Sequence, residues 1–235
     1  MSFVWQMLEQ ALTRIGDADA SLLATTWRTL RLAFGATFVA VVVGLPLGVA
    51  IAQARRPRWR RAGFTLANAG LGLPPVVLGV FLALVLLPGA PLGGLHLVNT
   101  LWGVFLAQVL LALPIVVALG AAAVAGLPAG LLDQARAFGA GPVARGALAL
   151  REAWVGVLVA VIAALGSAVA EVGAVVIVGG NIQERTSTLA SQVLLDLSAG
   201  DPAGATADVL VLLAIVAVLG AVLTLVQQRA KAARA

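Results

Sequence analysis

Residues 154–181 read WVGVLVAVIAALGSAVAEVGAVVIVGGN, an apolar stretch that contains a single charged residue, Glu171. A helix of about 20 apolar residues is long enough to cross the hydrocarbon core of a membrane. The stretch therefore predicts one membrane-spanning helix, Trp154–Val178, which ends at the Gly-Gly-Asn sequence of residues 179–181. A carboxylate inside such a helix is energetically costly, and it normally faces a helix bundle, a partner or a water-filled path.

The rest of the chain also has the composition of a membrane protein. Of its 235 residues, 61% are hydrophobic and 11% are charged, whereas a soluble domain has about 25% charged residues. No polar segment is long enough to form a domain with its own core. We expect an all-α fold, a polytopic helical membrane protein with about five transmembrane helices: Leu32–Ala54, Phe64–Leu87, Leu101–Val124, Trp154–Val178 and Val209–Val226.

Most of the 15 basic residues fall on one side of this arrangement. They are Arg55, Arg56, Arg58, Arg60, Arg61, Arg136, Arg145, Arg151, Arg229, Lys231 and Arg234. Loops rich in Lys and Arg face the cytoplasm, so we expect the N-terminus outside and the C-terminus in the cytoplasm. Residues 1–31 would be an extracytoplasmic or interfacial segment, 32–227 a transmembrane domain with a cytoplasmic loop at 126–152, and 228–235 a basic cytoplasmic tail. Because topology accounts for the positive charge, no nucleic-acid partner is expected.

Several kinds of chemistry are excluded by the residues that the sequence lacks. There is no cysteine and no tyrosine, and His96 is the only histidine. Disulfides, thiolate metal sites and a histidine cluster within one chain are therefore impossible, and we expect no metal site and no catalytic residue. Met1–Ala20 lacks a basic region followed by an apolar one, so no cleavable signal peptide is expected.

Small residues accompany Glu171 along the predicted helix. Ala163, Gly166, Ala170 and Gly173 recur at spacings of three and four, and such residues let membrane helices approach closely. On a continuous helix, Ser167 would lie four residues from Glu171 on a neighbouring face. One interpretation is that a translocation path or gate is lined by Ser167, Glu171 and Gly173, together with Gly179, Gly180 and Asn181 at the end of the helix. The other is that Glu171 is a buried acceptor that bonds backbone amides or a hydroxyl.

The segment after this helix offers a second candidate site. Paired glycines allow backbone conformations that other residues avoid, so Gly179, Gly180 and Asn181 could expose N–H donors that suit an oxyanion. Arg185 and Thr186 follow and could add donors at an outer mouth. A tight turn that only ends the helix, or the docking of a partner protein, explains the same pattern.

The sequence also predicts two amphipathic helices and an interruption of one membrane span. Val4, Leu8, Leu12 and Ile15 recur at helical spacing and predict a helix that either lies in the membrane interface on the outer surface or packs as an arm on the helix bundle. A short amphipathic helix is expected around Leu189–Leu197, with Thr186 and Ser187 as candidate caps. Leu71–Pro75 predicts an interruption of the second span, as a structural kink or as part of a gate.

The loop at 126–152 has no arrangement of residues that suits acid–base catalysis. Its pattern predicts a short helix, Leu131–Phe138, that is stopped by Gly139. A short helix followed by a glycine between two spans is more typical of a docking element than of an active site.

This loop resembles the Glu-Ala-Ala loop of ABC importer permeases, which docks on the ATPase. Asp133 stands in place of the family's glutamate, Ala135 and Gly139 match the pattern, and Arg151 occupies a position where proline is common. Arg136 and Phe138 lie within the same match. Residues 170–174 (AEVGA), 178–182 (VGGNI) and 200–201 (GD) are similar to tungstate-type permeases of this superfamily, as are 45–48 (LPLG), 72–79 (GLPPVVLG) and 151–153 (REA).

The resemblance implies a homodimer in the cytoplasmic (inner) membrane of a bacterium or archaeon, with membrane lipids around it. Each copy would dock on a cytoplasmic P-loop ATPase through Asp133–Gly139, and an extracytoplasmic binding protein would deliver the oxyanion. The substrate would be tungstate, with molybdate or sulfate as alternatives. ATP and Mg²⁺ would be bound by the ATPase, so this chain needs no cofactor. It has a single lysine, Lys231, and no glycine-rich phosphate loop.

Two other classes of function remain as alternatives. A self-sufficient channel or secondary carrier would use Glu171 as an ion or proton site, and it would support flux without an ATPase. A membrane-embedded enzyme would need clustered acids, a histidine or a nucleophile at one depth, and the sequence shows no such cluster.

Overall fold

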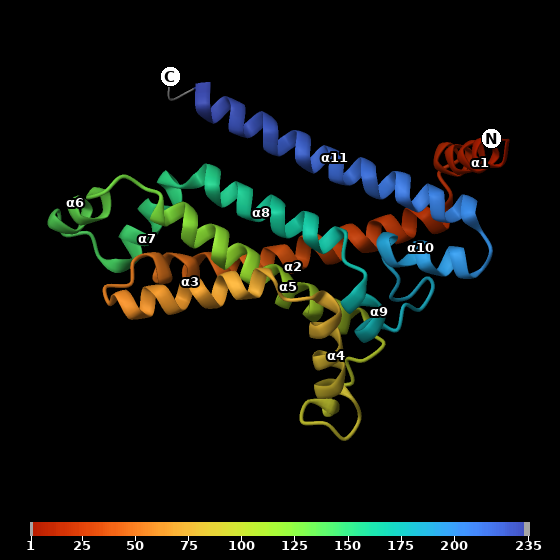
Figure 1. Ribbon diagram of the computed structural model, residues 1–235, viewed down its shortest axis with the longest axis horizontal. Coiled ribbons are helices and arrows are strands. Elements are labelled where there is room, and N and C mark those ends of the chain that lie inside the picture. Colours follow the sequence, from red (N-terminus) through yellow and green to blue (C-terminus); the bar gives the residue numbers. More distant parts are fainter. Residues whose placement is uncertain (1, 233–235) are drawn as a thin grey trace. The chain divides into compact units, whose positions relative to one another are not determined.

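The structure is a computed structural model that describes residues 2–232. Within these residues the fold is entirely helical and contains no strand, as predicted (Figure 1). Residues 233–235, with Arg234 of the expected basic tail, lie outside the described residues. The elements are α1 (Ser2–Gly16), α2 (Ala20–Ala52), α3 (Pro57–Leu71), α4 (Pro75–Leu86), η1 (Gly93–Leu95), α5 (Leu101–Ala125), α6 (Leu131–Ala137), α7 (Pro142–Glu152), α8 (Trp154–Val169), α9 (Gly173–Gly179), α10 (Leu189–Ser198) and α11 (Pro202–Ala232).

Three helices, α2, α5 and α11, are long and apolar enough to cross a membrane, and there are up to five spans if the broken pairs α3–α4 and α7–α8 each count as one. This agrees with the prediction of about five. Three helices begin earlier than the predicted spans: α2 at Ala20 rather than Leu32, α3 at Pro57 rather than Phe64, and α11 at Pro202 rather than Val209. Hydropathy alone misses these starts, since the first turns are more polar than the rest of each span.

The early starts of α2 and α11 each have a carboxylate cap. Asp19 Oδ1 accepts hydrogen bonds from the backbone amides of Ser21, at 2.8 Å, and Leu22, at 3.1 Å. Asp201 Oδ1 accepts one from the Gly204 amide at 3.0 Å. Such bonds satisfy first-turn donors that have no partner within the helix.

The chain forms two compact units. The first consists of residues 1–36, 74–109 and 165–219, and the second of residues 37–73, 110–164 and 220–235. In the second unit a small-residue core, with Ala40, Ala112 and Ala164, joins α2, α5 and α8. A Cβ at Gly48 would lie only 2.9 Å from the Ala121 nitrogen, so glycine permits the close approach of α2 and α5.

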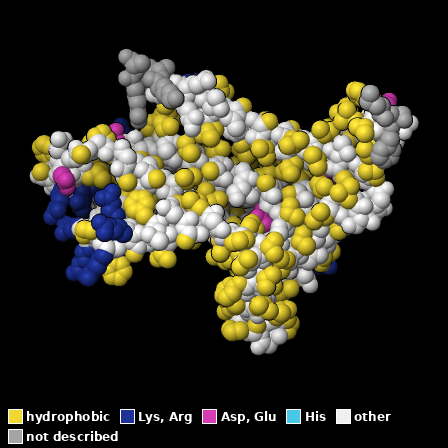
Figure 2. All heavy atoms as spheres, viewed as in Figure 1, with side chains coloured by type: hydrophobic (Ala, Val, Ile, Leu, Met, Phe, Trp, Pro, Cys, Tyr) yellow, Lys and Arg dark blue, Asp and Glu magenta, His cyan; other side chains and the backbone are white. Residues whose placement is uncertain are grey.

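In the first unit, α4 and α9 pack closely together. A Cβ at Gly79 would lie 2.9 Å from Ala174 Cα, and one at Gly173 would lie 2.8 Å from Val76 Cγ2. The other side of α4 carries exposed apolar side chains, and Figure 2 shows its surface as almost continuous yellow. The predicted break at Leu71–Pro75 is confirmed, since α3 ends at Leu71 and α4 begins at Pro75.

The two predicted amphipathic helices are present as α1 and α10. On α1, Val4 and Trp5 are largely exposed, as expected of a helix whose apolar face meets an interface. The predicted cap of α10 was wrong, because Thr188 is the N-cap and forms a capping box with Ser191. Ser187 is fully buried instead.

Candidate functional site

The short helix predicted in the 126–152 loop is present as α6, which is followed by Gly139. Leu132 packs against the cluster of Val124, Ala149 and Ala153, and Ala135 is half-buried on the same side. The spacing of three between Leu132 and Ala135 places both on one face of a helix. This face anchors α6 to the rest of its unit and leaves the other face free.

The free face carries the residues that the resemblance singled out. Asp133 and Arg136 are exposed, and Phe138 is 91% exposed, which is unusual for a large apolar side chain. The helix ends in a Schellman motif, in which the Ala140 amide donates to the Ala135 carbonyl and the Gly139 amide to the Arg136 carbonyl, both at 2.9 Å. Gly139 takes the required left-handed conformation, with a φ of +85°.

Glu171 does not lie inside a helix, so the predicted continuous helix Trp154–Val178 is wrong. The chain breaks after Val169, and the Glu171 carboxylate accepts a hydrogen bond of 2.9 Å from the Ala174 amide in the first turn of α9. The side chain is 6% exposed. Because the free amides at a helix start favour a negative charge, Glu171 stabilises α9 in the manner of the buried-acceptor interpretation.

Three of the six predicted path residues, Ser167, Glu171 and Gly173, are not brought to one surface. Ser167 is exposed on α8, Glu171 is buried in the break, and Gly173 packs against Val76. Ser167 and Glu171 cannot share a helical face, because the helix ends between them. A path role for Ser167 remains a prediction, and its neighbours Ala163 and Ala170 are exposed as well.

The segment 179–188 closes on itself. Gly180 has a φ of +70° and lies against Asn99, so a Cβ would collide with the Asn99 side chain. The Thr186 hydroxyl donates to the Gly179 carbonyl at 2.7 Å and accepts from the Ile182 amide at 2.8 Å. The polar groups of this turn are therefore largely used within it.

Helix α2 holds the same segment from outside. Arg28 donates to the Ser187 carbonyl at 2.9 Å and to the Glu184 carbonyl at 2.6 Å, while the Thr29 hydroxyl accepts from the Leu189 amide at 2.8 Å. The sequence analysis missed these contacts. The sequence did contain a signal for them, because Arg28 and Thr29 place a cation and a hydroxyl near the start of an otherwise apolar helix.

This packing corrects one candidate at the outer mouth. Thr186 is 2% exposed and its hydroxyl is bonded in both directions, so it cannot face an outer opening together with Arg185, which is exposed. The Asn181 side-chain amide donates to the Ser191 carbonyl at 3.1 Å, again within the same unit. Arg185 alone remains available to an external anion or partner.

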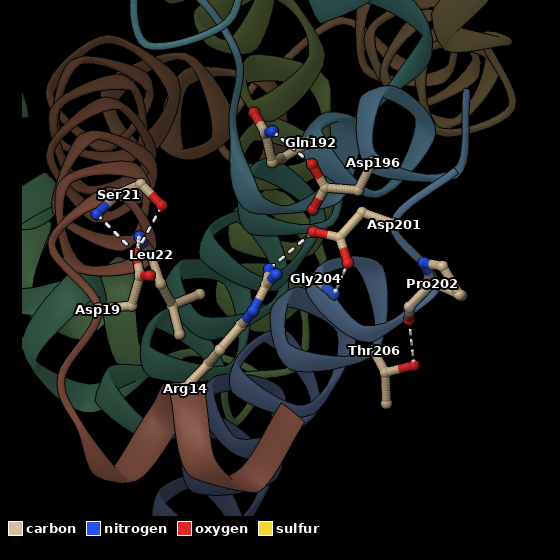
Figure 3. A network of polar contacts seen from close by, with 10 residues as sticks. All are labelled: Arg14, Asp19, Ser21, Leu22, Gln192, Asp196, Asp201, Pro202, Gly204 and Thr206. Atoms are coloured by element: carbon tan, nitrogen blue, oxygen red, sulfur yellow. Dashed lines mark hydrogen bonds and ion pairs between the residues drawn. The ribbon is translucent and has the colours of Figure 1, made fainter. Parts of the chain in front are cut away.

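A polar corner that the sequence analysis also missed lies where α1, α10 and α11 begin or end (Figure 3). Arg14 of α1 forms an ion pair of 2.8 Å with Asp201. The Gly204 amide, more than Arg14, lowers the pKa of Asp201 below its ordinary value, and the Ser21 hydroxyl chiefly lowers the pKa of Asp19. Within residues 2–232, no three His, Cys, Asp or Glu side chains are grouped so that they could hold a metal ion.

Arginines gather at the start of α3. Arg55, Arg60 and Arg61 line one shallow hollow, and Figure 2 shows a dark-blue patch of Lys and Arg side chains. These are residues that the sequence analysis assigned to the cytoplasmic side from their charge.

Comparison with known proteins bears directly on these features. Residues 44–232 match the family model described as "Binding-protein-dependent transport system inner membrane component". A "Probable anion ABC transporter permease protein" of Haloferax volcanii is 35% identical over 77% of this chain and 78% of its own length. The tungstate uptake system permease TupB of Peptoclostridium acidaminophilum is 27% identical over 97% of this chain and 100% of its own. The molybdenum transport system permease ModB of Azotobacter vinelandii is 33% identical over 73% of this chain and 79% of its own.

A solved structure shares the fold. An inward-facing structure of the MetNI methionine ABC transporter contains a chain that superposes with a TM-score of 0.69 at 20% identity, over 88% of this chain and 95% of that one. At this identity the likeness establishes the fold alone. Together with the family match, it shows that this chain belongs to the binding-protein-dependent transport system inner membrane components, as a membrane-spanning permease subunit of an ABC importer.

Proposed function

We propose that this chain is the permease of an importer for an oxyanion, tungstate in the first place, and that two copies form one path that works by alternating access. The observation that carries the proposal is the exposed docking element, α6 with Gly139, inside the region that matches the family. Its Asp133, Arg136 and Phe138 side chains meet no other part of their unit that would occupy them, so they are available to a cytoplasmic ATPase.

The substrate class is supported by the names of the relatives. One relative is a tungstate permease that aligns along nearly the whole chain, one is an anion permease, and one is a molybdenum permease with a higher identity over a shorter length. Tungstate and molybdate are tetrahedral dianions of similar size, so molybdate is the nearest alternative and sulfate the next. Selectivity would reside in the binding protein, where the anion is fully coordinated.

The division of labour follows from the residues that this chain has and lacks. With one lysine and no glycine-rich phosphate loop, the sequence has no phosphate-binding motif of its own. The partner ATPase would bind ATP and Mg²⁺, and its cycle would shift the population between inward- and outward-open dimers. The N-terminus and the corner near Asp201 would face outward, and α6 inward.

The test is reconstitution of the permease with its ATPase and binding protein in proteoliposomes, with labelled tungstate, molybdate and sulfate offered separately. We expect uptake only with enclosed ATP and only in the presence of the binding protein. Partners would be obtained by affinity purification of the permease from its native membrane and identified by mass spectrometry. Flux by the permease alone would contradict the proposal and favour a self-sufficient carrier.

A further inference from the structure

The seven residues from 55 to 61, between α2 and the second turn of α3, include five arginines. This arginine cluster consists of Arg55, Arg56, Arg58, Arg60 and Arg61, all of them exposed. The second unit, to which the cluster belongs, has only two acidic residues, Asp133 and Glu152. Neither acid forms an ion pair with the cluster among residues 2–232. The charge of the cluster is therefore not paired with a carboxylate of its own unit.

The cluster lies at a helix end where positive charge is unfavourable. The start of a helix carries a partial positive charge, which negative groups stabilise and cations oppose. Helix α3 nevertheless has no acidic residue in its first turn, and its N-cap, Arg56, makes no side-chain hydrogen bond to the helix. The preference of cytoplasmic loops for Lys and Arg accounts for the sign of these charges. It does not account for their concentration at one helix start, which an anion from outside the chain would offset.

The cluster also lies where the chain leaves one membrane span and enters the next. Helix α2 ends at Ala52, and the broken pair α3–α4 counts as the following span. Trp59, among the arginines, is 62% exposed, and Leu66, two helical turns later, is 73% exposed. Tryptophan is enriched at the boundary between membrane and water, and arginine can extend its charge to the headgroups along an apolar stem. These side chains place the cluster at the level of the lipid headgroups.

The hollow at the start of α3 has both charged and apolar walls. Arg55, Arg60 and Arg61 line it together with Phe64 and Thr65. Guanidinium groups bind phosphate oxygens through paired N–H donors, and a phospholipid carries its phosphate beside apolar chains that suit the phenyl ring. A choline headgroup brings a cation of its own toward the arginines, so a lipid with a net negative charge fits better than a zwitterionic one.

We propose that the arginine cluster binds the phosphate groups of anionic phospholipids of the surrounding membrane. Clusters of four to eight basic residues next to a membrane span attract such lipids. The inference depends on the membrane-spanning fold and not on the transported anion. It therefore goes beyond the proposed function, and either can fail without the other.

The test uses native mass spectrometry of the permease–ATPase complex in a neutral detergent, titrated with phosphatidylglycerol or phosphatidylcholine. We expect the wild type to bind phosphatidylglycerol more tightly, and the double variant Arg60→Gln/Arg61→Gln to raise the Kd of the first bound phosphatidylglycerol by at least about threefold. The matched control, Arg151→Gln/Arg229→Gln, removes the same charge from two exposed arginines outside the cluster and should change this Kd by less than about 1.5-fold. Equal effects of the two double variants would show general attraction by net charge and would overturn the inference.

Two further measurements exclude other anionic partners. Sodium phosphate and sodium chloride, compared at equal ionic strength, should weaken the binding of phosphatidylglycerol equally. Stronger displacement by phosphate would assign the hollow to a free anion instead of a lipid. The amount of ATPase that copurifies is measured as well, and its loss in Arg60→Gln/Arg61→Gln with an unchanged lipid preference would show that the cluster docks the ATPase.

Thermal unfolding of the same proteins separates lipid binding from a structural role. Because Arg60→Gln/Arg61→Gln removes cations from a helix start, its melting temperature in neutral detergent should equal or exceed that of the wild type. Added phosphatidylglycerol should raise the melting temperature of the wild type and of Arg151→Gln/Arg229→Gln more than that of the cluster variant. A cluster variant that melts lower without lipid, and gains as much from phosphatidylglycerol as the wild type, would refute the inference.

Discussion

Two segments of this protein end a helix on a left-handed glycine, and they use it in opposite ways. After α6, Gly139 has open space around its Cα, and Phe138 beside it is almost fully exposed. After α9, Gly180 packs against Asn99, and the Thr186 hydroxyl that follows is bonded on both sides. The first segment leaves its side chains exposed at the surface of the chain. The second uses most of its polar groups in hydrogen bonds within the chain.

The difference shows why a glycine motif alone does not identify a binding site. In both segments a positive φ selects glycine. What separates them is whether the neighbouring donors and acceptors are left free. By that criterion α6 is the candidate docking surface, whereas most polar groups of segment 179–188 are bonded within the segment or to α2 and α10.

The largest expected effect is at the open segment. Gly139→Glu should abolish ATP-driven uptake in proteoliposomes, because the added side chain would stand between α6 and the ATPase. Gly139→Ala is the control, since it carries the same left-handed strain with one methyl group and should keep part of the activity. Full uptake by Gly139→Glu, with normal amounts of protein in the membrane, would show that α6 does not dock.

The closed segment should respond in stability instead. Gly180→Ala adds a collision with Asn99 to the left-handed strain, whereas Gly139→Ala adds the strain alone, about 1–2 kcal/mol. We therefore expect the lower melting temperature for Gly180→Ala, measured by thermal unfolding in detergent. If both variants had the same melting temperature, the close packing of residues 179–181 would contribute nothing to the stability of the protein.

A smaller effect is expected where α2 holds the closed segment. Arg28→Gln should weaken the bonds to the Ser187 and Glu184 carbonyls and destabilise the fold by about 1–3 kcal/mol. Arg185→Gln, at an exposed position of the same segment, should change stability by less than about 0.5 kcal/mol. Amide hydrogen exchange of residues 182–189 would measure how much each variant lowers the local stability of this segment. If Arg185→Gln lowered the rate of uptake more than Arg28→Gln did, a role for Arg185 at the outer mouth would be supported instead.

The smallest expected effect is a change in the stability of the protein at acidic pH. Asp201 has a folded pKa below its ordinary value of 3.8, so its contribution is complete above that value and is lost as the pH falls through the folded pKa. Its ion pair with Arg14 is partly exposed and contributes less than about 1 kcal/mol. The stability difference between the wild type and Asp201→Asn should be constant from about pH 7 to 5 and shrink toward pH 3. A difference that is unchanged at the acidic end would refute this account.

Much of the helical framework could be predicted from the sequence, because continuous apolar runs, the Leu71–Pro75 break and the stop at Gly139 are local signals. The start of α2 at Ala20 could not be predicted from hydropathy, since a polar cap at Asp19 determines it. The break before α9 was missed for a related reason. A periodicity analysis treats Glu171 as a residue within one helix, although Glu171 lies in the break and its carboxylate accepts a bond from the first turn of α9.

The sites divide in the same way. The short helix α6 and its stop at Gly139 were predictable, because both lie within one short stretch of sequence. The contacts of Arg28 with segment 179–188 and the ion pair of Arg14 with Asp201 join residues that are more than 150 positions apart. No local sequence pattern indicates which of these distant polar residues meet.

The exposed apolar side chains beside α6 also have a consequence for the turnover of the subunit in the cell. Phe138, directly after α6, is 91% exposed, and Val143, in the first turn of the neighbouring α7, is 86% exposed in the chain alone. Apolar side chains left in water are what chaperones and membrane proteases recognise. A permease made without its ATPase should therefore have a short half-life, so that turnover of orphan subunits would keep the two proteins in proportion.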